Sequence, residues 1–151
     1  MPDHEYRHRL TAAEDDLDEL AHVNNVVYLR WVQDAALAHS RAVGFEISKW
    51  RALGAAFVVR KHEIEFLQPT FAGDELELVT WVERWRAASS LRETRVVRLR
   101  DEVLVARATT LWVFTSLETG GPARIPASVR ESFTRPRGDA RERAAAVSPP
   151  R

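Results

Sequence analysis

The chain has 151 residues with 45% hydrophobic content, which fits one compact domain and is too short for two full domains. It carries 22 basic and 22 acidic residues and no cysteine, which argues against dedicated nucleic-acid binding and excludes disulfides, zinc–thiolate sites and thiol catalysis. The N-terminal residues lack a signal-peptide pattern, and no apolar run is long enough to span a membrane. We expect a cytoplasmic protein without nucleic-acid or membrane partners.

A short strand is expected at residues 6–10, and one long helix at residues 24–43. The helical segment contains neither Gly nor Pro and ends before Gly44, a suitable helix C-cap. Its apolar residues cover most of the helix circumference, a distribution typical of a helix surrounded by other structure. We therefore expect this helix to be central and largely buried.

From residue 55 the apolar pattern changes to a period of two, which favours strands. Strands are expected at residues 55–69, 75–85, 89–100 and 102–116, with a further helical turn or two at 127–133. Short connections between the later strands predict an antiparallel sheet. The fold class is therefore α+β, with a curved antiparallel sheet of about five strands around one long helix. We expect Trp81 and Trp112 on its outer face, where dimerisation would cover them.

Residues 1–133 are expected to form the folded domain, and residues 134–151 a disordered C-terminal tail. The tail is rich in Arg, Ala, Pro and Ser and has almost no apolar content.

The densest polar segment, residues 15–25, lies directly before the long helix. Asn24 and Asn25 suit a helix N-cap, and the acidic residues suit the positive helix end. Capping does not account for His22, nor for Tyr28, which follows at helical spacing.

The pattern Asp18-x-x-x-His22-Val23-Asn24-Asn25-x-x-Tyr28 resembles the signature of the hotdog-fold acyl-CoA thioesterases of the 4-hydroxybenzoyl-CoA thioesterase type. The resemblance extends over roughly residues 5–116 and includes Phe66-Leu67-Gln68-Pro69. It implies a long helix held by a curved antiparallel sheet, and a homodimer or homotetramer whose active sites lie between subunits. The element order read from the residues agrees with this fold independently.

The resemblance implies an acyl-CoA substrate that is hydrolysed without a cofactor. No metal site is expected. Asp18 matches the catalytic carboxylate, acting as a general base or as a nucleophile. The backbone N–H near Asn25 matches the oxyanion donor at the positive helix end. His22 could orient Asp18, donate to the thioester carbonyl, or hold the loop.

Five further residues are substrate-binding candidates, two of them as cations for the phosphates of coenzyme A. They are Asn24, Tyr28, Gln33, Arg60 and Lys61. His62, Arg84, Arg86 and Arg92 are further candidates near the phosphates.

Two positions depart from the family pattern. Ala21 stands where many relatives have Gly, and Gln33 where many have a Glu on the helix. Because a Gln side chain cannot act as a base, a mechanism with a second carboxylate there is excluded, although Gln33 can still bind a water molecule.

Two other functions stay open. The substrate could be an acyl group on acyl carrier protein, or the chain could bind acyl-CoA without hydrolysing it. Hotdog dehydratases rank lowest, because the His-Val-Asn-Asn pattern does not resemble theirs.

Overall fold

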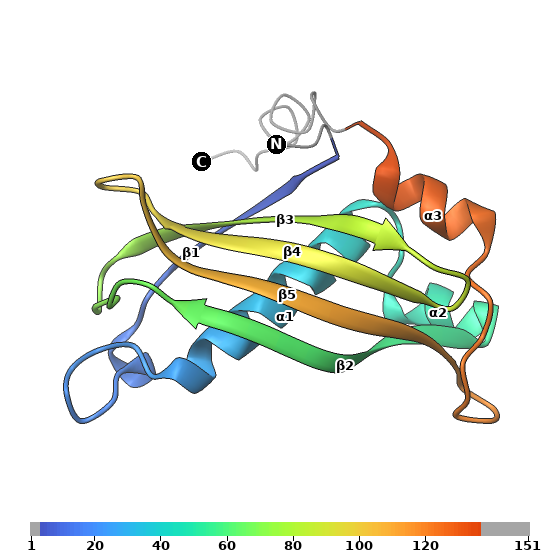
Figure 1. Cartoon of the computed structure of the whole chain (residues 1–151), viewed down its shortest axis with the longest axis horizontal. Coiled ribbons are helices and arrows are strands. Elements are labelled where there is room, and N and C mark those ends of the chain that lie inside the picture. Colours follow the sequence, from blue (N-terminus) through green and yellow to red (C-terminus); the bar gives the residue numbers. More distant parts are fainter. Residues whose placement is uncertain (1–3, 137–151) are drawn as a thin grey trace.

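The computed structural model describes residues 4–136. The elements in chain order are β1 Tyr6–Thr11, the 3-10 helix η1 Glu14–Asp16, α1 Asn25–Ala42, α2 Ile47–Leu53, β2 Ala55–Phe66, β3 Glu75–Trp85, β4 Ser89–Arg98, β5 Val103–Ser116 and α3 Ala127–Thr134. The five strands form one antiparallel sheet in the order β1-β3-β4-β5-β2. Figure 1 shows this sheet lying across α1, with α2 and α3 near one end of the molecule.

The predicted long helix and strands are confirmed. Asn24 caps α1 by accepting a hydrogen bond from Val26 N with its side chain, and β3 coincides with the predicted strand at 75–85. The short helix α2 was not predicted. It begins without a side-chain cap and ends at Gly54 in the left-handed conformation, where a residue without Cβ is favoured.

Strand β2 lies at one edge of the sheet. Within the sheet of the described residues, β2 pairs with β5 on one side and has no strand on the other. An unpaired edge strand presents backbone N–H and C=O groups to a possible partner chain.

The apolar core has two parts. One packs α1 against the middle of the sheet and includes Tyr28, Trp31, Ala35, Leu76 and Leu78. The other joins α2 and α3 to the sheet and includes Phe45, Trp50, Val82, Phe114 and Phe133. The buried residues of α1 extend from Tyr28 to Ser40, as expected for a central buried helix.

The prediction for the outer sheet face was half wrong. Trp81 does lie there, where Arg95 stacks over its ring and Glu83 accepts its indole N–H. Trp112, however, lines a cavity on the helix side together with Trp50 and Phe57. Both faces of β5 carry large apolar residues, so the alternation alone did not show which face meets the helix.

The predicted disordered tail lies almost entirely outside the described residues. Of residues 134–151, the structure describes 134–136, and Thr134 is the last residue of α3. None of the described helices combines the length and apolar character needed to cross a membrane.

Candidate active site

The loop before α1 is a small closed hairpin. The amide of Asp18 donates to His22 O at 2.8 Å, and the amide of Ala21 donates to Asp18 O at 3.0 Å. Closing this turn places Ala21 at a φ of 62°, in the left-handed region that favours glycine. The departure from Gly noted in the sequence therefore falls on a position with a real backbone requirement.

The carboxylate of Asp18 is fixed by the loop backbone. Its Oδ1 accepts the amide of Leu20 at 2.9 Å and that of His22 at 3.2 Å. Its Oδ2 has no hydrogen-bond partner among residues 4–136. One carboxylate oxygen is thus held in place while the other is available to a substrate or a water molecule.

Asp16 anchors the loop to the helix. Its carbonyl accepts the amide of Asn24, and its carboxylate accepts Ala13 N at 2.9 Å and Arg30 Nη2 at 2.8 Å. This buried aspartate therefore has a structural role in the loop before α1.

The first turn of α1 leaves one amide unused. The N–H groups of Val26 and Val27 both donate to Asn24, to the side-chain oxygen and the carbonyl oxygen respectively. No described residue accepts the N–H of Asn25. A free amide at the positive end of an eighteen-residue helix is suited to stabilise a developing oxyanion.

One pocket brings the predicted catalytic residues together. It has a volume of about 210 Å³, and Asp18, His22, Asn25 and Tyr28 line it on the side of α1. Residues 66–69, at and beyond the end of β2, line the other side. Asp18, with its fixed carboxylate, and Asn25, with its free helix amide, therefore line the same space.

Two residues that the sequence did not reveal, Thr70 and Arg98, hold the pocket wall opposite the loop. The hydroxyl of Tyr28 donates to Thr70 Oγ1 at 2.6 Å, and Thr70 O accepts the amide of Val23. Arg98 donates to Pro69 O at 3.1 Å and pairs with Asp101. These contacts join segments far apart in the chain, so no local motif could indicate them.

His22 is held mainly by its backbone and by ring packing. Its ring lies edge-on to Phe71, with centroids 5.3 Å apart. No hydrogen bond joins its ring to the Asp18 carboxylate in the described part of the chain. The ring is half-buried and lines the pocket.

The remaining predicted residues lie outside this pocket. Asn24 lines a neighbouring hollow together with Asp18. Gln33 is exposed on α1. Arg60 and Lys61 are exposed on β2, and Lys61 Nζ pairs with Glu63 at 2.8 Å.

Arg92 differs from the other candidate cations for the coenzyme A phosphates. It is 5% exposed and lies on the inner face of β4, where it contacts His39 of α1. A guanidinium in this position does not form part of a solvent-facing phosphate site.

The chain belongs to the thioesterase-like superfamily, whose family model matches residues 13–133. The resemblance drawn from the His-Val-Asn-Asn segment is therefore confirmed, and the fold is the hotdog fold.

Individual relatives agree with this assignment. The chain is 24% identical over 126 residues to the chloroplastic acyl-acyl carrier protein thioesterase ATL3 of Arabidopsis thaliana, covering 82% of this chain and 65% of that relative. A 1,4-dihydroxy-2-naphthoyl-CoA thioesterase from Synechocystis superposes with a TM-score of 0.80 at 17% identity, covering 87% and 96% of the two chains. A Staphylococcus aureus protein solved in complex with CoA gives 0.82 at 12% identity, covering 90% and 87%.

Proposed function

We propose that this protein is an acyl-CoA thioesterase that hydrolyses the thioester to a carboxylic acid and free coenzyme A. The observation that carries the proposal is the shared pocket of Asp18 and Asn25, with a fixed carboxylate and an unused helix amide. The names of the family and of its structural neighbours support the same chemistry.

The N–H of Asn25 would hold the thioester oxygen as negative charge develops on it. In the general-base route, Asp18 takes a proton from water as the water oxygen bonds to the carbonyl carbon. The tetrahedral intermediate then collapses, the carbon–sulfur bond breaks, and the thiolate recovers the proton. In the nucleophilic route, Asp18 itself attacks the carbonyl carbon, and the carbon–sulfur bond breaks to release the thiolate. Water then hydrolyses the resulting mixed anhydride to the carboxylic acid and regenerates the Asp18 carboxylate. The free Oδ2 serves either route.

The activity test is thiol release from a panel of short, long and aromatic acyl-CoA esters. Because the protein has no cysteine, a thiol-reactive dye reports the product alone. Replacing Asp18 by Asn should preserve the shape of the site and lower kcat about a thousandfold or more. Asp15, an exposed carboxylate outside the pocket, offers a matched control, and Asp15→Asn should keep the wild-type rate. A near wild-type rate in Asp18→Asn would exclude the proposed role.

Acyl carrier protein is the alternative carrier of the acyl group, and the name of the Arabidopsis relative supports it. The same acyl group presented on both carriers separates the two, because the true carrier gives the higher kcat/KM. Tight acyl-CoA binding without thiol release on either carrier would instead indicate a non-catalytic binding protein.

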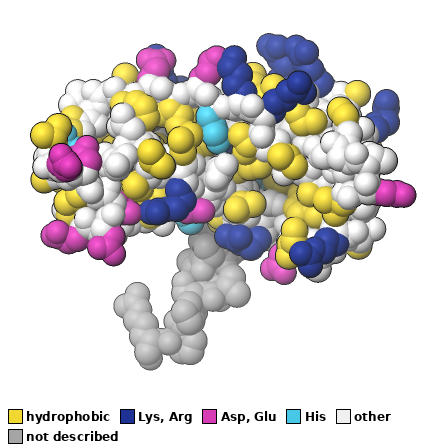
Figure 2. All heavy atoms as spheres, turned by 90° about the horizontal axis from the view of Figure 1, so that it is seen from below, with side chains coloured by type: hydrophobic (Ala, Val, Ile, Leu, Met, Phe, Trp, Pro, Cys, Tyr) yellow, Lys and Arg dark blue, Asp and Glu magenta, His cyan; other side chains and the backbone are white. Residues whose placement is uncertain are grey.

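We also propose that two copies pair through the free edge of β2. Figure 2 views the molecule from below, the side on which β2 lies in Figure 1, and shows hydrophobic side chains spread across it. Val58 of β2 is 52% exposed and Phe66 is 45% exposed. Association of copies would cover such side chains and satisfy the strand edge.

Antiparallel pairing of β2 with a second β2 would place opposite ends of the two strands side by side. Phe66, at one end, lines the pocket of Asp18 and Asn25, whereas Ala56, at the other end, lines the cavity of Trp112. Each catalytic pocket would therefore adjoin the cavity of the other copy. Light scattering tests the pairing through the molar mass, and a monomer at assay concentrations would contradict it.

A further inference from the structure

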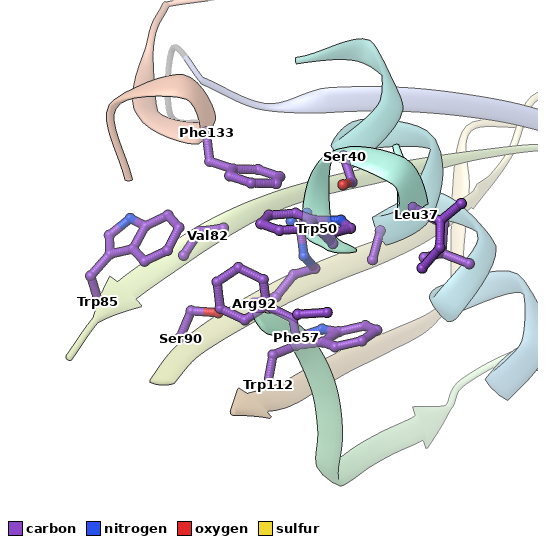
Figure 3. A pocket seen from close by; sticks show the side chains of 13 residues that line it. Leu37, Ser40, Trp50, Phe57, Val82, Trp85, Ser90, Arg92, Trp112 and Phe133 are labelled. Atoms are coloured by element: carbon purple, nitrogen blue, oxygen red, sulfur yellow. The ribbon is translucent and has the colours of Figure 1, made fainter. Parts of the chain in front are cut away.

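The cavity on the helix side is apolar but contains a buried cation. It has a volume of about 140 Å³ and is enclosed by α1, α2, α3 and the inner face of the sheet. Trp50, Phe57, Val82 and Phe133 supply apolar walls, and Arg92 lies among them (Figure 3).

Arg92 is held without a carboxylate partner. Its Nη1 donates to Thr80 Oγ1 at 3.1 Å and contacts His39 Nδ1 at 3.0 Å, and its guanidinium lies 5.7 Å from the centroid of the Phe133 ring. Within residues 4–136, no Asp or Glu oxygen forms an ion pair with it. Burial lowers the pKa of Arg92 to about 9, because the charged form loses its hydration.

Two tryptophan side chains beside Arg92 have an unsatisfied indole N–H. Trp85 and Trp112 both line the cavity, and each has a buried indole N–H without a hydrogen-bond partner in the described structure. An indole N–H can only donate. The cavity therefore combines apolar walls with a buried guanidinium, and no carboxylate among residues 4–136 balances its charge.

We propose that this cavity binds an apolar carboxylate, the far end of an acyl group, with Arg92 as the residue that selects it. A cavity of about 150 Å³ accommodates a molecule the size of benzene, so the group is a short carboxylate-ended chain or a single ring. Leu37 and Ile47, which are 48% and 61% exposed, lie at the rim and mark the entrance. This inference rests on the proposed thioesterase function only in identifying the ligand as part of an acyl group.

The reacting thioester would come from the neighbouring copy. Asn25 and Ser40 lie near opposite ends of α1, about 22 Å apart along its axis, so a small acyl group cannot reach from one to the other within one protomer. Antiparallel pairing through β2 removes this difficulty, since the catalytic pocket of one copy then adjoins the Arg92 cavity of the other.

Binding is tested without turnover by titrating the protein with benzoate and with neutral benzamide in a calorimeter. Benzoate should bind the wild type, and Arg92→Met should weaken its binding about 30-fold or more, whereas Arg92→Lys should restore part of it. Benzamide should bind both forms alike. Arg95 lies on the opposite face of the same strand, over Trp81, so Arg95→Met is the matched control and should leave benzoate binding unchanged.

Selectivity is tested with glutaryl-CoA and hexanoyl-CoA, which are similar in length and differ in a terminal carboxylate. The wild type should favour glutaryl-CoA in kcat/KM, and Arg92→Met should lower the ratio of the two values about 30-fold or more. If Arg92→Met does not fold, Leu37→Trp at the exposed rim provides the second test, because it should block benzoate while leaving Arg92 in place.

The outcomes separate the two proposals. Benzoate binding that depends on Arg92, in a protein that hydrolyses no thioester, keeps the carboxylate site and removes the thioesterase. Thioester hydrolysis with equal benzoate affinity in the wild type and Arg92→Met, or with benzoate unaffected by Leu37→Trp, removes the carboxylate site and keeps the thioesterase.

Discussion

The hydroxyl of Tyr28 donates a 2.6 Å hydrogen bond to Thr70 Oγ1, which lies 42 residues further along the chain. Tyr28 is the fourth residue of α1, and Thr70 follows the segment that forms the opposite wall of the catalytic pocket. Both residues are buried, and Thr70 also accepts the amide of Val23 through its carbonyl. This bond therefore sets the separation of the two pocket walls.

Removing the hydrogen bond between Tyr28 and Thr70 should lower the stability of the protein more than its catalytic rate. Burial raises the pKa of Tyr28, so the phenol keeps its proton at neutral pH and acts as a donor to Thr70. Tyr28→Phe should lower the free energy of unfolding by about 1 kcal/mol. Urea denaturation of Tyr28→Phe, Thr70→Val and the double variant measures the coupling between the two side chains. Strictly additive losses would show that the bond contributes nothing.

The role of the Asn25 amide can be tested without disturbing the helix. Asn25 is the first residue of α1, where proline is tolerated, and Asn24 has φ −62° and ψ 137°, which suits a residue before proline. Asn25→Pro removes the N–H and should lower kcat about a hundredfold or more, with little change in KM or in stability. Asn25→Ala, which keeps the N–H, is the control. Equal kcat values for the two variants would rule out this amide as the oxyanion donor.

The left-handed conformation of Ala21 predicts a stabilising substitution. Ala21 is exposed and has a φ of 62°, so Ala21→Gly should relieve backbone strain and raise the free energy of unfolding by about 0.5–1 kcal/mol. Ala21→Val should lower it, because a β-branched side chain is more strained there. Thermal denaturation measures both variants, and the reverse order would show that the loop relaxes in solution.

The pH dependence of stability should reflect His62. Burial lowers the pKa of this side chain from its ordinary value of 6.5, and its Nδ1 lies 2.9 Å from Thr110 Oγ1. Below that ordinary value the unfolded chain binds the proton first, so the stability present at higher pH is lost as the pH falls. Urea denaturation should show a decline between about pH 7 and pH 5, and His62→Gln should flatten it. The burial of His8, which lowers its pKa in the same direction, accounts for a remaining slope.

Local signals in the sequence predicted most of the architecture. The absence of Gly and Pro before Gly44 located α1, and strict alternation located β3. The short helix α2 was not predicted, because it has no side-chain cap and only seven residues. Near the end of β3, a register shift between Val82 and Arg84 changes the alternation and turns Trp85 toward the helix side, which the sequence pattern does not show.

The candidate site likewise contains residues that a local motif identified and residues that only the three-dimensional structure reveals. Asp18, His22 and Asn25 are close in sequence, so one motif identified them, and the structure gathers them at one pocket. Thr70 and Arg98 support this pocket from distant segments. Arg92 was recognised only as one of several arginines, because its burial and its missing carboxylate partner depend on three-dimensional packing.

The strand order has a consequence for how the chain acquires its structure. Phe57 of β2 lies opposite Phe114 of β5, whereas β3 and β4 form between them in sequence. During synthesis from the N-terminus, β2 therefore emerges long before its partner, and its apolar side chains await closure by the last strand. Such long-range pairing slows folding and prolongs exposure of aggregation-prone segments. Truncations that remove β5 should therefore leave β2 unpaired, with its apolar side chains exposed and prone to aggregation. Chaperones should bind such a truncated chain.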